Sequence, residues 1–219
     1  MGVVRWHLRQ RQPLSTKLPI ETKALSRPDN QPESLTDIED EVRECQLCPL
    51  HRSRRKPVFG SGNSKATWLL VGEAPGAEED RQGLPFVGRA GQLLTAMLRA
   101  VGMKRQEIYI ANVLKCRPPQ NRDPFGAEVQ QCELYLHRQI ALIQPRLIIA
   151  MGRFAAQSLL RSSESIGRLR GIVHQYRDTG IPLLVTYHPA YLLRQPSDKY
   201  KAWSDLKLAL KVDTDKRQQ

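Results

Sequence analysis

The chain has 219 residues, of which 40% are hydrophobic, so it is long enough for one domain with a sizeable core and a tail. It contains no run of 18 apolar residues, which excludes a membrane-spanning helix, and no secretory segment, so we expect a cytoplasmic protein with reduced cysteines. The net charge of +12 favours a polyanionic partner, because each phosphate neutralised by Lys or Arg releases a counterion.

The first 35 residues are rich in Pro, Arg, Lys, Gln and Ser and carry no apolar period, which predicts a flexible basic tail. The alternative is a DNA-binding arm made of Arg5, Arg9, Arg11 and Lys17. Order is expected from residue 36, where Asp37 and the spacing of Ile38 and Val42 predict a capped helix. We therefore expect a single domain over 36–212 and a polar tail over 213–219.

Four short apolar runs predict buried parallel strands, at residues 67–71, 108–113, 147–150 and 183–186. Helical patterns separate or follow them, at residues 91–100, 127–142, 154–160 and 198–210. Alternating strands and helices predict an α/β sandwich around a parallel sheet. Residues 167–177 add a small hairpin or a further strand.

Chemically useful residues follow these strands. The turn Gly72-Glu73-Ala74-Pro75-Gly76 follows the first, Asn112 ends the second, and His188 follows the fourth. Ligands of open parallel sheets bind beyond the carboxyl ends of the strands, so the carboxylate, amide and imidazole should converge there. A tight loop and a structural histidine are the alternatives. The glycine spacing fits neither a dinucleotide fingerprint nor a phosphate loop.

The four cysteines are Cys45, Cys48, Cys116 and Cys132. The Cys-x-x-Cys pair can direct two thiolates at one metal centre, and the later pair can complete four ligands. Their spacing alone leaves zinc, an iron–sulfur cluster and unliganded buried thiols open.

Together these motifs resemble type-4 uracil-DNA glycosylases over residues 40–210. The resemblance is carried by six ordered segments: Cys45-Gln46-Leu47-Cys48-Pro49-Leu50, Gly72-Glu73-Ala74-Pro75-Gly76, Gly83-Leu84-Pro85-Phe86-Val87-Gly88, Asn112-x-x-Lys115-Cys116-Arg117-Pro118-Pro119, Asn121-Arg122-Asp123-Pro124 and His188-Pro189-Ala190-Tyr191-Leu192-Leu193-Arg194. The resemblance implies a three-layer α/β/α sandwich with a four-stranded parallel sheet. It also implies excision of uracil from DNA, and a 4Fe-4S cluster rather than zinc on the four cysteines.

By resemblance, Phe86 stacks on a uracil that has been flipped out of the duplex, and Asn112 reads its Watson–Crick edge. His188 donates to uracil O2 and stabilises the charge of the leaving base. These roles compete with ordinary ones, namely a core Phe, a turn-capping Asn and a structural His.

Water activation is assigned less directly. Other uracil glycosylases carry an Asp at the position of Ala74, whereas here the neighbouring Glu73 orients the water or supports the loop. Backbone carbonyls of the turn, which includes Gly72, are the alternative. Glu79 could block the thymine methyl, and Asn121 is a further candidate near the site.

The segment Leu192-Leu193-Arg194 is the expected wedge that fills the vacated base stack, with the first turn of a packed helix as the alternative. The basic run at residues 51–56 could contact phosphates or be a solvated loop. We expect a monomer that acts on uracil-containing DNA and associates with the nucleoid.

Two other functions are alternatives. A related group links covalently to the abasic sugar through a His in a basic loop, but residues 161–171 contain no His. A noncatalytic iron–sulfur DNA-binding or redox protein would need the cysteines and the charge, but neither Asn112 nor His188.

Overall fold

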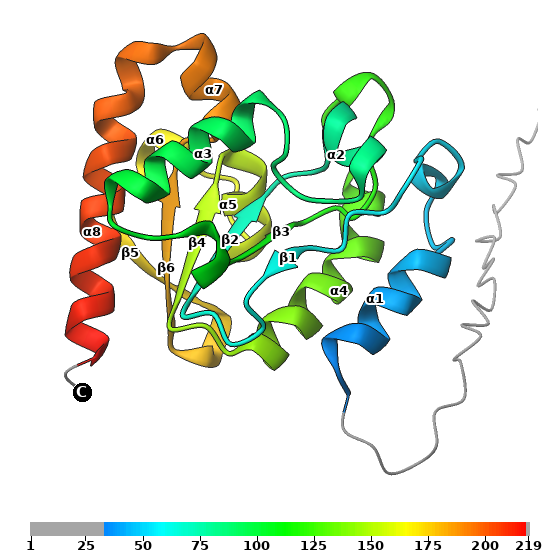
Figure 1. Cartoon of the computed structure of the whole chain (residues 1–219), viewed down its shortest axis with the longest axis horizontal. Coiled ribbons are helices and arrows are strands. Elements are labelled where there is room, and N and C mark those ends of the chain that lie inside the picture. Colours follow the sequence, from blue (N-terminus) through cyan, green and yellow to red (C-terminus); the bar gives the residue numbers. More distant parts are fainter. Residues whose placement is uncertain (1–32, 218–219) are drawn as a thin grey trace, which may run out of the picture. The chain divides into compact units, whose positions relative to one another are not determined.

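The structure, a computed structural model, describes residues 33–217 (Figure 1). The predicted basic arm of Arg5, Arg9, Arg11 and Lys17 lies outside the described residues. From Glu33 onward the chain forms one compact unit. No helix among the described residues is both long and apolar enough to cross a membrane.

The centre of this unit is a parallel sheet of β2 (Trp68–Gly72), β3 (Tyr109–Asn112), β4 (Leu147–Met151) and β6 (Ile181–Thr186). The order is β3-β2-β4-β6, and all neighbours in this set are parallel. The four predicted strands are therefore confirmed, with bounds within two residues.

Two short antiparallel strands extend the sheet to six within the described residues. β1 (Ser61–Gly62) pairs with β3, and β5 (Val173–Tyr176) pairs with β6. β5 lies in the stretch where an extra strand was expected, whereas β1 was not predicted because two residues carry no readable alternation.

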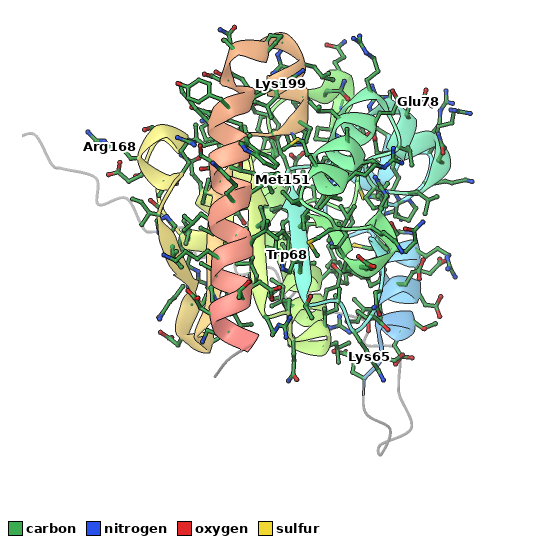
Figure 2. The ribbon with its side chains drawn as sticks, turned by 60° about the vertical axis from the view of Figure 1, so that its left-hand side comes forward. Lys65, Trp68, Glu78, Met151, Arg168 and Lys199 are labelled. Atoms are coloured by element: carbon green, nitrogen blue, oxygen red, sulfur yellow. The ribbon has the colours of Figure 1, made fainter. Side chains whose placement is uncertain are left out.

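Helices cover both faces of the sheet, which confirms the three-layer sandwich (Figure 1). On one face, α3 (Arg89–Ala100) and α8 (Lys199–Arg217) pack on Trp68, Leu70 and Ile149. Figure 2 shows Trp68 and Met151 in this interior, between those two helices. On the other face, α4 (Gly126–Ile143) and α5 (Arg153–Leu160) pack on Leu69, Val71 and Ile148.

The expected capped helix is α1 (Leu35–Glu44), which packs against α4. Ser34 and Asp37 form a reciprocal capping box that satisfies two backbone N–H groups of the first turn. Arg138 of α4 fastens the pair by bonding the carboxylates of Glu33 and Glu41. α1 thereby brings Cys45, its C-terminal cap, against the cluster that contains Cys116 and Cys132.

The C-terminal boundary differs from the prediction. α8 continues to Arg217, so residues 213–217 are helical rather than a polar tail. The reason is Asp213, which is buried and paired with Arg146 at 2.9 Å. An inward-facing ion pair holds the last turns of the helix on the domain, and no periodicity of apolar residues could reveal it.

The remaining elements are short connections between these layers. They are η1 (Pro49–Arg52), α2 (Ala77–Gln82), η2 (Arg105–Glu107), η3 (Pro119–Asn121), α6 (Ile166–Leu169), η4 (Arg177–Thr179), α7 (Pro189–Arg194) and η5 (Pro196–Asp198).

Candidate active site and cysteine pocket

A pocket of about 410 Å³ opens at the carboxyl ends of the parallel strands. The predicted convergence is correct, because its lining combines residues that follow β2, β3 and β6. Among the predicted site residues it includes Glu73, Ala74, Glu79, Phe86, Asn112, Asn121, His188 and Arg194. Gly72 lies directly behind it, against the side chains of Asn112 and Phe86.

Asn112 is the last residue of β3 and is only 2% exposed. Its Oδ1 is buried and has no hydrogen-bond partner among the described residues. Leaving such an acceptor unpaired costs about 1–3 kcal/mol, so this atom is prepared for a donor from a ligand. A Cβ at Gly72 would come within 2.4 Å of Oδ1, which explains why glycine stands there.

His188 caps the N-terminus of α7, and its Nδ1 accepts a hydrogen bond from the Ala190 N–H at 3.1 Å. Burial, with a smaller effect of Arg194, lowers the pKa of His188 to about 4. The ring is therefore neutral near pH 7 and carries its proton on Nε2. The pocket gains a neutral N–H donor rather than a cation.

Phe86 lies beside His188, with the ring centroids 5.4 Å apart. Its φ of 52° lies in the left-handed region, which is unfavourable for a residue with a side chain. The Glu79 carboxylate compensates by accepting the N–H groups of Val87 and Gly88 at 2.9 and 3.0 Å. Glu79 thus holds the loop that presents the aromatic ring.

A second close contact fixes the same loop. A Cβ at Gly91 would come within 1.8 Å of the Phe86 carbonyl oxygen, so only glycine lets α3 approach so closely. Gly72 therefore leaves room for the tip of the Phe86 ring, and Gly91 leaves room for the Phe86 backbone.

Glu73 is the acidic group of the pocket. Burial, together with the charge of Asp123, raises the pKa of Glu73 to about 7, while Arg153 opposes the shift. Arg153 also pairs with Asp123 at 3.3 Å. A carboxyl poised near pH 7 can exchange protons with a bound water. The carbonyls of Gly72 and Glu73 already accept from Val113 and Leu114, which weakens the alternative that they hold the water.

Asn121 lies at the rim with a positive φ of 55°, and its Oδ1 accepts from Arg117 at 2.8 Å. The sequence reasoning did not assign its neighbours Arg122 and Asp123 to the pocket, although both line it. In the sequence they appear only as members of the Asn121-Arg122-Asp123-Pro124 motif, and their residue types alone do not indicate a role in the pocket.

The wedge assignment needs a correction. Leu192 is 0% exposed, so it is a packed residue and not an exposed wedge. The segment is the helix α7, which packs against α3 and turns Leu192 inward. Leu193 is half-buried, and Arg194 is exposed at the pocket.

All four cysteines line a second pocket, next to the first, between α1, η1 and α4. None forms a disulfide. The Cys116 sulfur accepts from Arg54 Nη1 and the Cys132 sulfur accepts from the Lys115 N–H, each at 3.1 Å. Burial raises the pKa of Cys132 to about 12 and also raises that of Cys116.

The surroundings of the four sulfurs limit what the cysteines could hold. Among residues 33–217, no group of three or more Cys, His, Asp or Glu side chains is arranged to hold a single metal ion. Four cysteines without a disulfide nevertheless lie together, and donors reach the sulfurs of Cys116 and Cys132, which fits thiolates bound to a metal centre.

Lys115 connects the two pockets. Its side chain is buried, and its Nζ donates to the Asn112 carbonyl at 2.9 Å and to Gln139 Oε1 at 2.6 Å. Its backbone N–H is the donor to Cys132. The base of the cysteine pocket and the end of β3 are therefore held by one residue, which sequence reasoning noticed only as part of a motif.

An aromatic ring, an amide with an unpaired oxygen and a neutral imidazole meet at the carboxyl edge of a parallel α/β/α sandwich. This combination of fold and site is that of the uracil-DNA glycosylase superfamily. The family model described as "Uracil DNA glycosylase superfamily" matches residues 59–207.

Curated relatives narrow this class. The chain is 45% identical over 181 residues to the type-4 uracil-DNA glycosylase of Archaeoglobus fulgidus, covering 80% of this chain and 91% of the relative. It is 42% identical over 165 residues to the type-4 enzyme of Thermotoga maritima, covering 75% and 85%. A type-5 uracil-DNA glycosylase of Thermus thermophilus is 30% identical over 151 residues, covering 61% and 68%. The chain belongs to the type-4 uracil-DNA glycosylase family.

Proposed function

We propose that the chain excises uracil from DNA by hydrolysing the bond between the base and the deoxyribose, which leaves an abasic site for base excision repair. The observation that carries the proposal is the unpaired Asn112 Oδ1, buried in the same pocket as Phe86 and a neutral His188. The base is inaccessible inside a duplex, so it must be everted into this pocket.

Selection of uracil follows from the Asn112 amide. Its Oδ1 accepts the N3–H of uracil and its Nδ2 donates to O4. Cytosine offers no proton at N3 and an amino donor in place of O4, so both contacts would fail. Unpaired polar groups in a buried site give strong discrimination of this kind. Phe86 would stack on the uracil ring, a contact worth about 1–3 kcal/mol.

His188 acts on the departing base. Cleavage leaves negative charge on uracil and positive charge on the sugar, and the Nε2–H of His188 donates to O2 where the charge develops. Loss of one such donor typically lowers the rate by about 10²–10³-fold. Water adds to the sugar carbon, and its proton passes to a base in the pocket while uracil leaves as the anion.

Glu73 is proposed as the group that orients this water, with Ala74 and Gly72 shaping the turn around it. Glu79 and Asn121 line the base pocket, and Glu79 is also suited to exclude a methyl group at C5 of the base. Leu193 and Arg194 are proposed to fill the space that the everted base leaves in the stack. Leu192 is not part of this wedge because it is buried.

The four cysteines are proposed to hold a 4Fe-4S cluster, which would serve as a structural crosslink. Cys45 and Cys48 come from the end of α1 and the loop after it, while Cys116 and Cys132 come from the segment after β3 and from α4. Iron and sulfide analysis tests this, with a visible absorbance that is lost in Cys132→Ser. Stoichiometric zinc without iron would overturn it.

A strand-cleavage assay tests the activity. Purified protein is incubated with oligonucleotides that contain a single uracil, cytosine or thymine, and abasic sites are then cut with alkali. We expect cleavage at uracil alone. A brown, iron-loaded protein that leaves the uracil strand intact would support the noncatalytic iron–sulfur binding protein instead. Action on DNA would place the protein with the nucleoid, and we expect it to act as a monomer.

A further inference from the structure

An exposed aromatic side chain stands next to the uracil pocket without an assigned role. Phe125 precedes the first turn of α4, and its side chain is 60% exposed. Its neighbours Arg122 and Asp123 line the pocket. The Arg122 guanidinium carbon lies 3.8 Å from the centre of the Phe125 ring, so the ring is within one side chain of the pocket mouth.

The pair is rigid because one buried carboxylate holds both members. Glu128 is 3% exposed and accepts from Arg122 Nη2 at 2.6 Å and from Nη1 at 2.9 Å. Its Oε2 also accepts the backbone N–H of Phe125 at 2.9 Å. Arg122 therefore has little freedom to swing away, and its guanidinium stays against the Phe125 ring, which remains largely open to solvent.

The chemistry of this arrangement suits a nucleotide. The guanidinium, paired with Glu128, lies over one face of the ring, and the rest of the ring is an exposed apolar surface. A nucleobase offers a planar face that can stack on the exposed ring. A ring exposed for this purpose also explains why it is not packed into the core, as Leu136 of the same helix is.

We propose that Arg122 and Phe125 form a stacking platform for an unpaired base next to the everted uracil. The proposal rests on the proposed function and adds a substrate preference to it. In a duplex, the flanking bases remain stacked on their own neighbours and are not free to reach the ring. In a single strand they are free, so the platform should favour uracil in single-stranded DNA.

Binding measurements test this without relying on catalysis. The dissociation constant of the full chain is measured for a single-stranded oligonucleotide and for the matching duplex, with and without uracil. Phe125→Ala is expected to weaken single-strand binding about tenfold and duplex binding less than about twofold. Phe125→Trp is expected to restore single-strand binding, because stacking needs only an aromatic face.

A matched control is Leu142→Ala, which removes an exposed apolar side chain at the far end of the same helix. It should leave both dissociation constants unchanged. Equal weakening of single-strand and duplex binding by Phe125→Ala, failure of Phe125→Trp to restore binding, or the same loss in Leu142→Ala would overturn the platform.

The inhibition constant of free uracil should not change in Phe125→Ala, since the platform lies outside the base pocket. A change there would also contradict the proposal. If the wild-type chain releases no uracil, the proposed function fails, whereas the platform is still judged by binding to single strands that contain no uracil.

Discussion

Two titratable residues of the proposed uracil pocket are shifted so that both favour their neutral forms. Burial lowers the pKa of His188 to about 4 and raises that of Glu73 to about 7. A neutral imidazole whose Nδ1 accepts from Ala190 keeps one N–H, at Nε2, that can donate to a departing base. A carboxyl near pH 7 can accept a proton from water once it is ionised.

His188 should therefore remain uncharged across the working range. An NMR pH titration of the imidazole signals, with the His188 resonance identified by its loss in His188→Ala, should show no ionisation of this ring between pH 5 and 8. A midpoint near the usual value of about 6.5 would contradict the burial and the fixed tautomer.

Glu73 should give the activity its pH dependence. The wild-type rate of uracil release is expected to rise through pH 7, as the carboxyl ionises, and to level off above it. In Glu73→Gln the rise should vanish, with the rate at pH 8 lowered about 10²-fold. An unchanged rate and profile in Glu73→Gln would remove Glu73 from water activation.

The same substitution has a separate consequence for stability. The folded-state pKa lies above the ordinary value of 4.5, so ionising Glu73 costs the folded state free energy as the pH rises from about 4.5 to 7. Glu73→Gln should be more stable than wild type by about 1 kcal/mol at pH 8, after allowing for partial exposure, and equal to it at pH 4. Thermal melts at both pH values measure this difference.

At the scale of elements, the loop between α2 and α3 decides where Phe86 stands. Glu79→Ala would leave the N–H groups of Val87 and Gly88 without their acceptor and release a residue with an unfavourable φ. We expect the inhibition constant of free uracil to rise about tenfold. Glu78→Ala is the matched control, because Glu78 is exposed and its bonds within residues 33–217 go only to Arg81 and Gln82 on the same helix. Equal effects of the two substitutions would contradict the proposal that the Glu79 carboxylate holds the Phe86 loop in place.

The elements also show what the sequence could predict. Continuous apolar runs predicted the four parallel strands. Because parallel strands end at the same edge of the sheet, Asn112 and His188 could be predicted to lie at one edge. The wedge prediction for Leu192 is wrong because an apolar residue after the His188 segment has the same sequence pattern whether it points outward as a wedge or inward from a short helix. The hydrogen bonds from Val87 and Gly88 to the Glu79 carboxylate require the loop to fold back on itself. Gly88 lies nine residues after Glu79, and no local sequence pattern encodes this contact.

At the scale of the whole molecule, the charge of +12 should govern encounter with DNA. Contacts to three or more phosphates predict a log–log slope of the association constant against salt of about −2 or steeper for single strands. Free uracil is uncharged, so its inhibition constant should stay flat over the same range. Both constants are measured over the same salt range. If the association constant for DNA were also independent of salt, the Lys and Arg side chains would not be contacting its phosphates.

The central claim is that Asn112 and His188 act on the same everted uracil. Single-turnover release of uracil from an oligonucleotide tests it most directly, in wild type, Asn112→Ala and His188→Ala of equal iron content. We predict that each substitution lowers the rate at least about 10²-fold. A full rate in either variant would contradict the pocket.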